Sequence, residues 1–126
     1  MASGRPWVSP VYYALDGYSQ FYWVSSPEAT HSRNIAARPE VAIVIFDSRA
    51  PIGRGQGVYM SAMAEELLGD DLDTGIAIFS RRSEAHGAGG WTPEDVSSPA
   101  CHRLYRAIAA EHSLLGPQDR RTPVSV

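Results

Sequence analysis

The sequence contains no lysine, and its eleven basic residues are all arginines. The absence of lysine excludes Schiff-base chemistry, which needs a lysine amine. A single cysteine, Cys101, excludes an intramolecular disulfide and fits a reducing compartment. The formal net charge of −3 gives none of the strongly basic footprint that nucleic-acid binding leaves, so we expect no nucleic-acid partner.

Long apolar segments are also missing. No apolar run approaches the roughly 20 residues that a helix needs to cross a membrane. Residues 1–6 lack the apolar core of a signal peptide. We therefore expect a soluble, cytoplasmic protein without a membrane partner.

Recognisable metal and phosphate motifs are absent as well. No pair of the four histidines has the spacing of a helical metal motif, so we expect no metal site. The glycine-rich stretch 53–57 is not followed by a lysine, and its spacing fits neither a phosphate loop nor a dinucleotide fingerprint. We interpret it as a hairpin connection.

The first half of the chain reads as strands around a short helix. An aromatic and β-branched run over 7–15 predicts a strand, with Pro10 placing it at an edge or a bulge. Asp16-Gly17 predicts a hairpin turn into a returning strand over 20–25. A helix is predicted from His31 to Arg38, ended by Pro39. Six apolar residues over 41–46 predict a strand buried on both faces.

The second half predicts a further strand over 58–67 and a helix opening at Gly69-Asp70-Asp71, with Leu72, Ile76 and Phe79 on one face. Thr92 and Ser98 look like two successive helix starts. Residues 112–115 and 122–126 are expected to form a closing pair of strands. The sum is one domain over 1–126, mainly β, with six strands in a small antiparallel barrel and helices outside it.

The start of the predicted helix suits an anion. Free backbone N–H groups and a positive field favour phosphate there, and Ser25, Ser26, His31, Ser32 and Arg33 flank it. On the residues alone, His31 reads equally as an exposed helix residue. Aromatic side chains cluster on the first hairpin, which predicts either a dimer interface alone or a dimer interface combined with a ligand groove.

Four motifs, in order and spacing, resemble the pyridoxamine 5′-phosphate oxidase-like family of FMN-binding split barrels. They are Gly-Arg-Pro-x-Val-Ser-Pro-Val-Tyr-Tyr with Asp-Gly, Phe-Tyr-Trp-Val-Ser-Ser, Ser-Arg-Asn-Ile-x-x-x-Pro-x-Val-Ala, and Gly-Val-Tyr-x-x-x-Ala-Glu, within residues 4–67. Residues 103–107 resemble the tail of short members. The resemblance implies a six-stranded split barrel, a homodimer with FMN at its interface, and an oxidoreductase acting on a small molecule.

The resemblance also implies which residues meet the cofactor. The flavin ring and ribityl chain would lie along the first strand, formed by Val8, Ser9, Pro10, Val11, Tyr12 and Tyr13. The ring or phosphate side would meet Val24 and Ser25, and the phosphate would meet His31, Ser32 and Arg33. The ring would also lie near Gln56. Tyr12, Tyr13 and Trp23 are candidates for the substrate side. No catalytic acid or base is assigned, because the flavin itself supplies the chemistry.

Departures from the family pattern keep other functions open. His31 stands where members have lysine or arginine. The helix and strand that precede the first motif in members are not in this sequence. The C-terminal extension through which pyridoxamine phosphate oxidases bind substrate is not in it either, and its absence argues against vitamin B6 oxidation. The alternatives are a deazaflavin-dependent reductase, whose acidic coenzyme Arg33, Arg38 and Arg54 would meet, and a non-enzymatic flavin- or haem-binding barrel.

Overall fold

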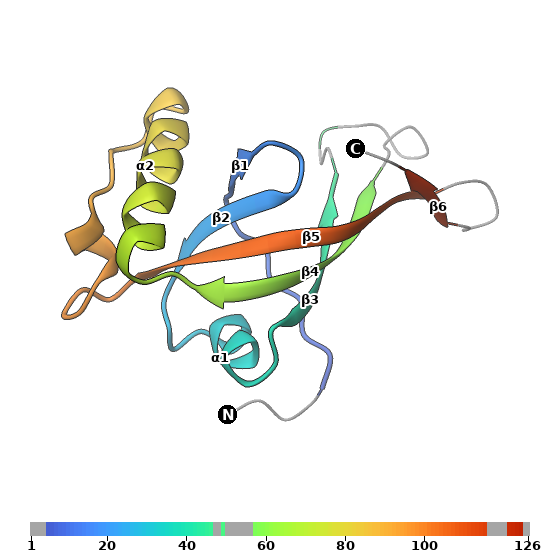
Figure 1. Ribbon diagram of the computed structural model, residues 1–126, viewed down its shortest axis with the longest axis horizontal. Helices are drawn as coiled ribbons and strands as arrows, with labels where there is room; N and C mark the ends of the chain where they lie inside the picture. Colours follow the sequence, from blue (N-terminus) through green and yellow to red (C-terminus); the bar gives the residue numbers. More distant parts are fainter. Residues whose placement is uncertain (1–4, 47–48, 50–56, 116–120, 125–126) are drawn as a thin grey trace.

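The computed structural model describes residues 5–46, 49, 57–115 and 121–124. Within these residues, six strands follow one another in pairs, with α1 between the first and second pair and α2 between the second and third (Figure 1). The elements are β1 (Ala14–Asp16), β2 (Gln20–Ser25), α1 (Thr30–Ala37), β3 (Glu40–Ile45), β4 (Val58–Glu66), α2 (Gly69–Ala85), the 3-10 helix η1 (Pro93–Val96), β5 (Arg103–Leu115) and β6 (Arg121–Val124).

The strands form one antiparallel sheet in the order β1-β2-β5-β4-β3, with β6 paired to the far end of β5. The start of β5 pairs with β2 and its end with β6, while β4 runs along its other edge. In the described residues no ladder joins β1 to β3, so the sheet is not closed. The predicted six-stranded antiparallel architecture is confirmed.

The first hairpin forms where it was predicted, but its first strand is shorter. Asp16 pairs with Gln20 across the turn, and Gly17 has a φ of 66°, a left-handed conformation that glycine adopts without steric cost. Of the strand predicted over 7–15, only Ala14 and Leu15 pair with β2, and β1 extends one residue further to Asp16. Pro6 and Pro10 have no N–H to donate, and no described strand lies beside this segment, so it runs extended without a ladder.

The helix α1 and the strand β3 lie close to their predicted positions. The helix ends at Ala37, ahead of Pro39, because the residue before a proline avoids helical geometry. The prediction that the next strand is buried on both faces is wrong. β3 is an edge strand whose residues alternate between half-buried and exposed, and Val44 remains 43% exposed.

The largest error concerns β5. The sequence predicted a helix starting at Ser98, yet residues 103–115 form one strand. Leu104 and Tyr105 point to opposite faces of the sheet and are both buried, because β5 lies between β2 and β4 and each face is covered. The start at Thr92 does form η1, with a reciprocal capping box between Thr92 and Asp95. The predicted closing pair is confirmed for the described residues, where β5 meets β6.

Two apolar clusters lie on the two faces of the sheet. One lies under α2, whose predicted apolar face is confirmed by the burial of Leu72, Ile76 and Phe79. The other contains Phe21, Trp23, Ile35, Met60, Ala62, Ala64, Tyr105 and Ala107. Successive residues of β2 therefore face opposite clusters, as the two-residue period of a strand requires.

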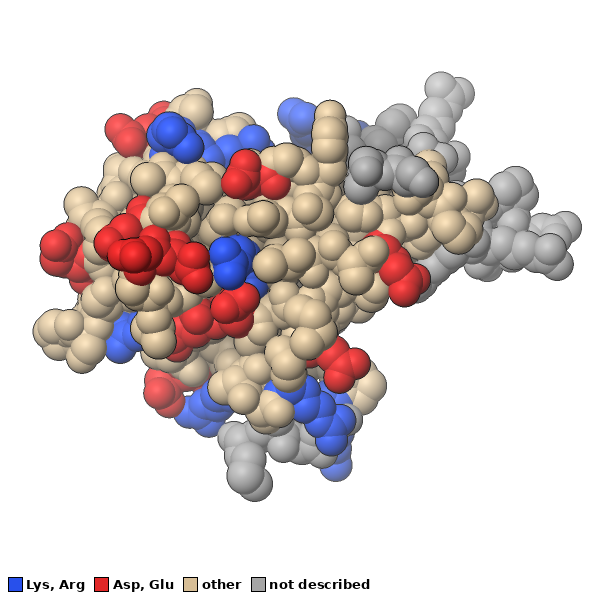
Figure 2. All heavy atoms as spheres, in the orientation of Figure 1, with Lys and Arg blue, Asp and Glu red and all other residues tan. Residues whose placement is uncertain are grey.

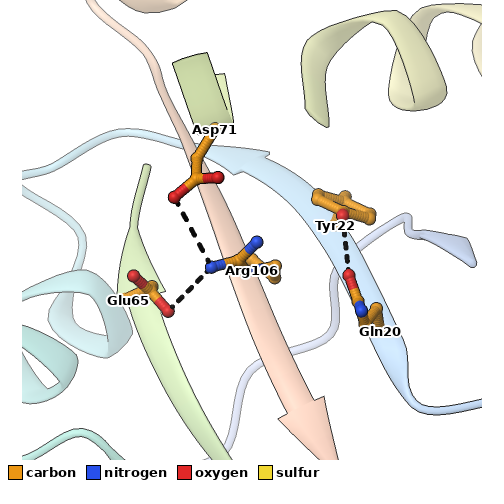
Figure 3. Close-up of polar contacts among 5 residues, drawn as sticks. All are labelled: Gln20, Tyr22, Glu65, Asp71 and Arg106. Atoms are coloured by element: carbon orange, nitrogen blue, oxygen red, sulfur yellow. Dashed lines mark hydrogen bonds and ion pairs between the residues drawn. The ribbon is translucent and has the colours of Figure 1, made fainter. Parts of the chain in front are cut away.

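A polar cluster ties α2 to the sheet (Figure 3). Arg106 of β5 places its Nη2 3.2 Å from Glu65 Oε2 on β4 and 3.9 Å from Asp71 Oδ2 on α2. Beside it on β2, the Tyr22 hydroxyl donates to Gln20 Oε1 over 3.0 Å. The Arg106 side chain is only 17% exposed, so its ion pair with Glu65 is less screened by solvent than a fully exposed one.

In the described part of the chain, no helix is long and apolar enough to cross a membrane.

Candidate functional site

An apolar groove of about 870 Å³ lies beside the extended N-terminal segment. We call it the N-terminal groove. Its lining residues come from the segment 5–13, from Phe21 and Trp23 of β2, from His31, Asn34 and Ile35 of α1, from Arg38 directly after α1, and from 40–46 in and after β3. Its volume falls within the range of small-molecule and cofactor sites.

Trp23 gives the N-terminal groove an aromatic residue held in one orientation. Its ring stacks on Tyr105 at a centroid distance of 5.8 Å and an interplanar angle of 16°. Its buried Nε1–H has no hydrogen-bond partner among the described residues. Since a buried donor without an acceptor costs about 1–3 kcal/mol, a nearby acceptor would be favourable.

The start of α1 brings His31 and Ser25 together. His31 Nε2 lies 2.9 Å from Ser25 Oγ, which joins the first turn of the helix to the end of β2. No side chain caps this helix start, and no acidic residue lies in its first turn. Burial of the ring lowers the pKa of His31 below its ordinary value of 6.5, so the ring is mainly neutral near pH 7.

Two arginines, Arg33 on α1 and Arg38 directly after it, differ in their partners. Arg33 binds Glu28 through Nη2 over 2.6 Å, and both side chains are largely exposed. Arg38 lines the N-terminal groove and has no ion pair with a described residue. Figure 2 shows basic side chains together with acidic ones at the lower end of the view, where Figure 1 places α1 and the N-terminal segment.

The structure brings seven of the predicted cofactor residues to the N-terminal groove: Val8, Ser9, Pro10, Val11, Tyr12, Tyr13 and His31. Ser25 reaches it through His31, whereas Ser32 is buried and Arg33 faces Glu28. Val24 packs against the cluster under α2, on the other side of β2 from Trp23. Gln56, like Arg54 and most of the glycine-rich stretch, lies outside the described residues.

Sequence reasoning named His31 and, for a deazaflavin coenzyme, Arg38, but it missed Asn34 and Ile35 between them. His31, Asn34, Ile35 and Arg38 follow the spacing of one helix face and line the N-terminal groove together. It also missed Phe21, which shares a face of β2 with Trp23. Both helical spacing and strand alternation were available signals. Among the described residues no three His, Cys, Asp or Glu side chains are grouped as metal ligands would be.

Comparison with protein families matches residues 1–111 to the family described as pyridoxamine 5′-phosphate oxidase. No curated protein matches the sequence. Together with the six-stranded sheet, the family match confirms the predicted split-barrel fold class.

Several solved structures share this fold. A heme binding protein from Mycobacterium smegmatis has a TM-score of 0.72 and 22% identity over 97% of this chain, which spans about half (48%) of that protein. An FAD-binding protein from Mesorhizobium loti has a TM-score of 0.60 and 22% identity, covering 90% of this chain and 79% of that one. An F420 reductase has a TM-score of 0.60 and 19% identity, covering 87% and 80%. At these identities the likeness shows the fold alone.

Proposed function

We propose that this chain, which belongs to the pyridoxamine 5′-phosphate oxidase family, is an FMN-dependent oxidoreductase acting on a small organic molecule. One observation carries the proposal. The N-terminal groove has cofactor size and apolar walls, and it is lined by His31 from an uncapped helix start that lacks acidic side chains. A planar ring with a phosphate tail has the chemistry that this combination suits.

The groups around the N-terminal groove fit such a cofactor. His31, the first-turn N–H groups of α1 and Arg38 are donors for a phosphate. The unpartnered Nε1–H of Trp23 is buried, so it would serve as a further donor only after the ring is uncovered. Arg33 would join the phosphate only by leaving Glu28, from which it is separated by 2.6 Å. Glu40 is the acidic residue among the lining residues.

Bound FMN would supply hydride or electron transfer, and the protein would supply binding and orientation. The apolar segment from Val8 to Tyr13 would hold the ring and exclude water from one side. His31 would hold a proton at its imidazole when a phosphate lies beside it. Tyr12 is 93% exposed in the single chain and would face the substrate at the interface with a second copy, whereas Trp23 is buried against Tyr105.

The homodimer belongs to the same proposal. Trp7, Val8, Tyr12 and Phe46, all lining the N-terminal groove, are each more than half exposed. Several large exposed apolar side chains around one groove are typical of an interface. We propose that a second copy covers it and completes the cofactor site. Sedimentation velocity of the wild-type chain with and without FMN tests this: dimers are expected, and a monomer that binds FMN fully would contradict it.

Haem binding is the second candidate, and the state of His31 favours it. A neutral imidazole is the form that ligates iron, and burial keeps His31 neutral near pH 7. A heme binding protein shares the fold. A deazaflavin coenzyme is less favoured, because Arg33 is already paired with Glu28. Haem and flavin have distinct visible spectra, so one titration separates them.

The test compares three ligands on the same protein: FMN, riboflavin and haemin. Riboflavin has the flavin ring but no phosphate, so it is the matched control for the helix start. FMN is expected to bind at least tenfold more tightly than riboflavin, since charge-assisted hydrogen bonds contribute about 1.5–3 kcal/mol. Equal affinity for the two flavins would contradict the phosphate site. Binding of haemin with a shifted Soret band and no binding of FMN would favour the second candidate.

A further inference from the structure

A second cavity, of about 1060 Å³, lies at the C-terminal end of α2. We call it the helix-end cavity. Its walls are the last turns of α2, the turn 86–91, η1 and the short segment 100–102. Val11, Tyr12 and Tyr13 line both this cavity and the N-terminal groove, so these residues separate the two. The proposed flavin site makes no use of the remaining walls.

The aromatic wall of the helix-end cavity is fixed in place. Trp91 N donates to Ser80 Oγ over 2.8 Å, and Ser83 Oγ donates to Gly89 O over 2.8 Å, so two serines of α2 hold the turn against the helix. Trp91 also packs edge-on against Phe79, at a centroid distance of 5.9 Å. The wall therefore exists before any ligand binds, which lowers the ordering cost of binding.

A cation without an acceptor lies in the same cavity. The Arg82 guanidinium carbon is 5.9 Å from the ring centroid of Tyr13, and the Arg82 side chain has no hydrogen bond or ion pair with a described residue. A cation–π contact of this kind uses none of the guanidinium N–H groups as hydrogen-bond donors, so they remain available to a ligand. The position in the last turn of α2 favours a cation but satisfies none of these donors.

The acidic groups of the helix-end cavity lie on another element. Asp95 and Glu94 belong to η1, and the Asp95 carboxylate already accepts from the Thr92 N–H and hydroxyl over 2.8 and 3.0 Å. Glu94 is exposed. A ligand carboxylate is therefore directed to Arg82 on α2 and away from η1.

We propose that the helix-end cavity binds a planar aromatic carboxylate. The carboxylate pairs with the edge of Arg82, and the ring packs on Trp91 and Phe79. A guanidinium edge matches the two oxygens of a carboxylate, and a fixed aromatic wall favours a flat ring over an aliphatic chain. The site requires no flavin and stands independently of the proposed function.

The test uses 2-naphthoate as the probe and 2-naphthalenemethanol as its neutral analogue with the same rings. Calorimetry on the full chain is expected to show binding of the acid and at least tenfold weaker binding of the alcohol. Arg82→Gln should weaken 2-naphthoate binding by about tenfold or more. Arg81→Gln is the matched control, because Arg81 is the exposed neighbour on the same helix and does not line the cavity. Its affinity should equal that of the wild type.

NMR spectra locate the probe. The amides of Gly89 and Gly90 and the indole of Trp91 are expected to shift on addition of 2-naphthoate. Shifts confined to Ser9 and His31, or competition by FMN, would place the probe in the N-terminal groove and overturn the proposal. Equal binding of acid and alcohol by the wild type would also overturn it, and this comparison needs no variant. Failure of FMN binding would leave the result for 2-naphthoate unaffected.

Discussion

Replacement of His31 by alanine tests how the start of α1 binds a phosphate. His31 is half-buried against Ser25, and burial lowers its pKa below 6.5 in the free protein. A bound phosphate favours the charged ring and raises the pKa of His31 in the complex. Wild-type affinity for FMN should therefore fall as the pH rises through the pKa of His31 in the complex.

The size of the effect follows from the charge state of the ring. Below the pKa of His31, the variant loses a charge-assisted hydrogen bond of about 1.5–3 kcal/mol, which corresponds to a 10- to 150-fold weaker Kd. Above the pKa in the complex, the neutral imidazole N–H still donates to the phosphate but adds no ion pair, so the variant loses less affinity than it does below the pKa. Protonation of the FMN phosphate is common to both proteins and cancels in the ratio of their Kd values.

The assay is quenching of FMN fluorescence at pH 5.5, 7.0 and 8.5 with wild type, His31→Ala and His86→Ala. His86 is an exposed histidine outside the N-terminal groove, so its variant should bind FMN as the wild type does at each pH. Circular dichroism checks that both variants fold. A Kd ratio for His31→Ala that is constant over this range, or that grows with pH, would refute the reasoning.

Three further predictions concern stability and are read from urea unfolding. Gly75→Ala should lower the free energy of unfolding by up to about 2 kcal/mol, because a Cβ there would lie 2.9–3.0 Å from side-chain atoms of Leu67 and Leu104. This overpacking outweighs the gain in helix propensity of about 1 kcal/mol. A more stable variant would contradict the packing of α2. Leu104→Ala should cost about 2–5 kcal/mol, since Leu104 is fully buried, and a loss below 1 kcal/mol would show that β5 is not central. Thr92→Ala should cost about 0.5–2 kcal/mol by removing the capping box with Asp95, and an unchanged unfolding midpoint would show that η1 contributes nothing to stability.

Local signals predicted the parts of the fold that depend on a few neighbouring residues. Pro39 ends α1 wherever the helix packs, and Asp16-Gly17 makes a tight turn regardless of the rest of the sheet. The apolar face of α2 was visible because three buried residues recur at helical spacing.

Non-local pairing explains the errors. Leu104, Tyr105 and Ile108 have spacings that suit a partial helix face, and only the choice of β2 and β4 as neighbours makes this segment a strand. The exposure of Val44 likewise depends on what covers β3, which the strand's own residues do not encode. For the site, the sequence predicted the segment from Val8 to Tyr13 and His31 as cofactor residues, and their roles stay predictions.

The central claim is that the N-terminal groove binds FMN, and an absorbance spectrum tests it most directly. Purified protein is incubated with excess FMN, separated from unbound flavin by gel filtration, and compared with a sample treated with riboflavin in the same way. The account predicts flavin bands that remain with the protein after FMN and are much weaker after riboflavin. Protein that elutes without any flavin bands after FMN would contradict it.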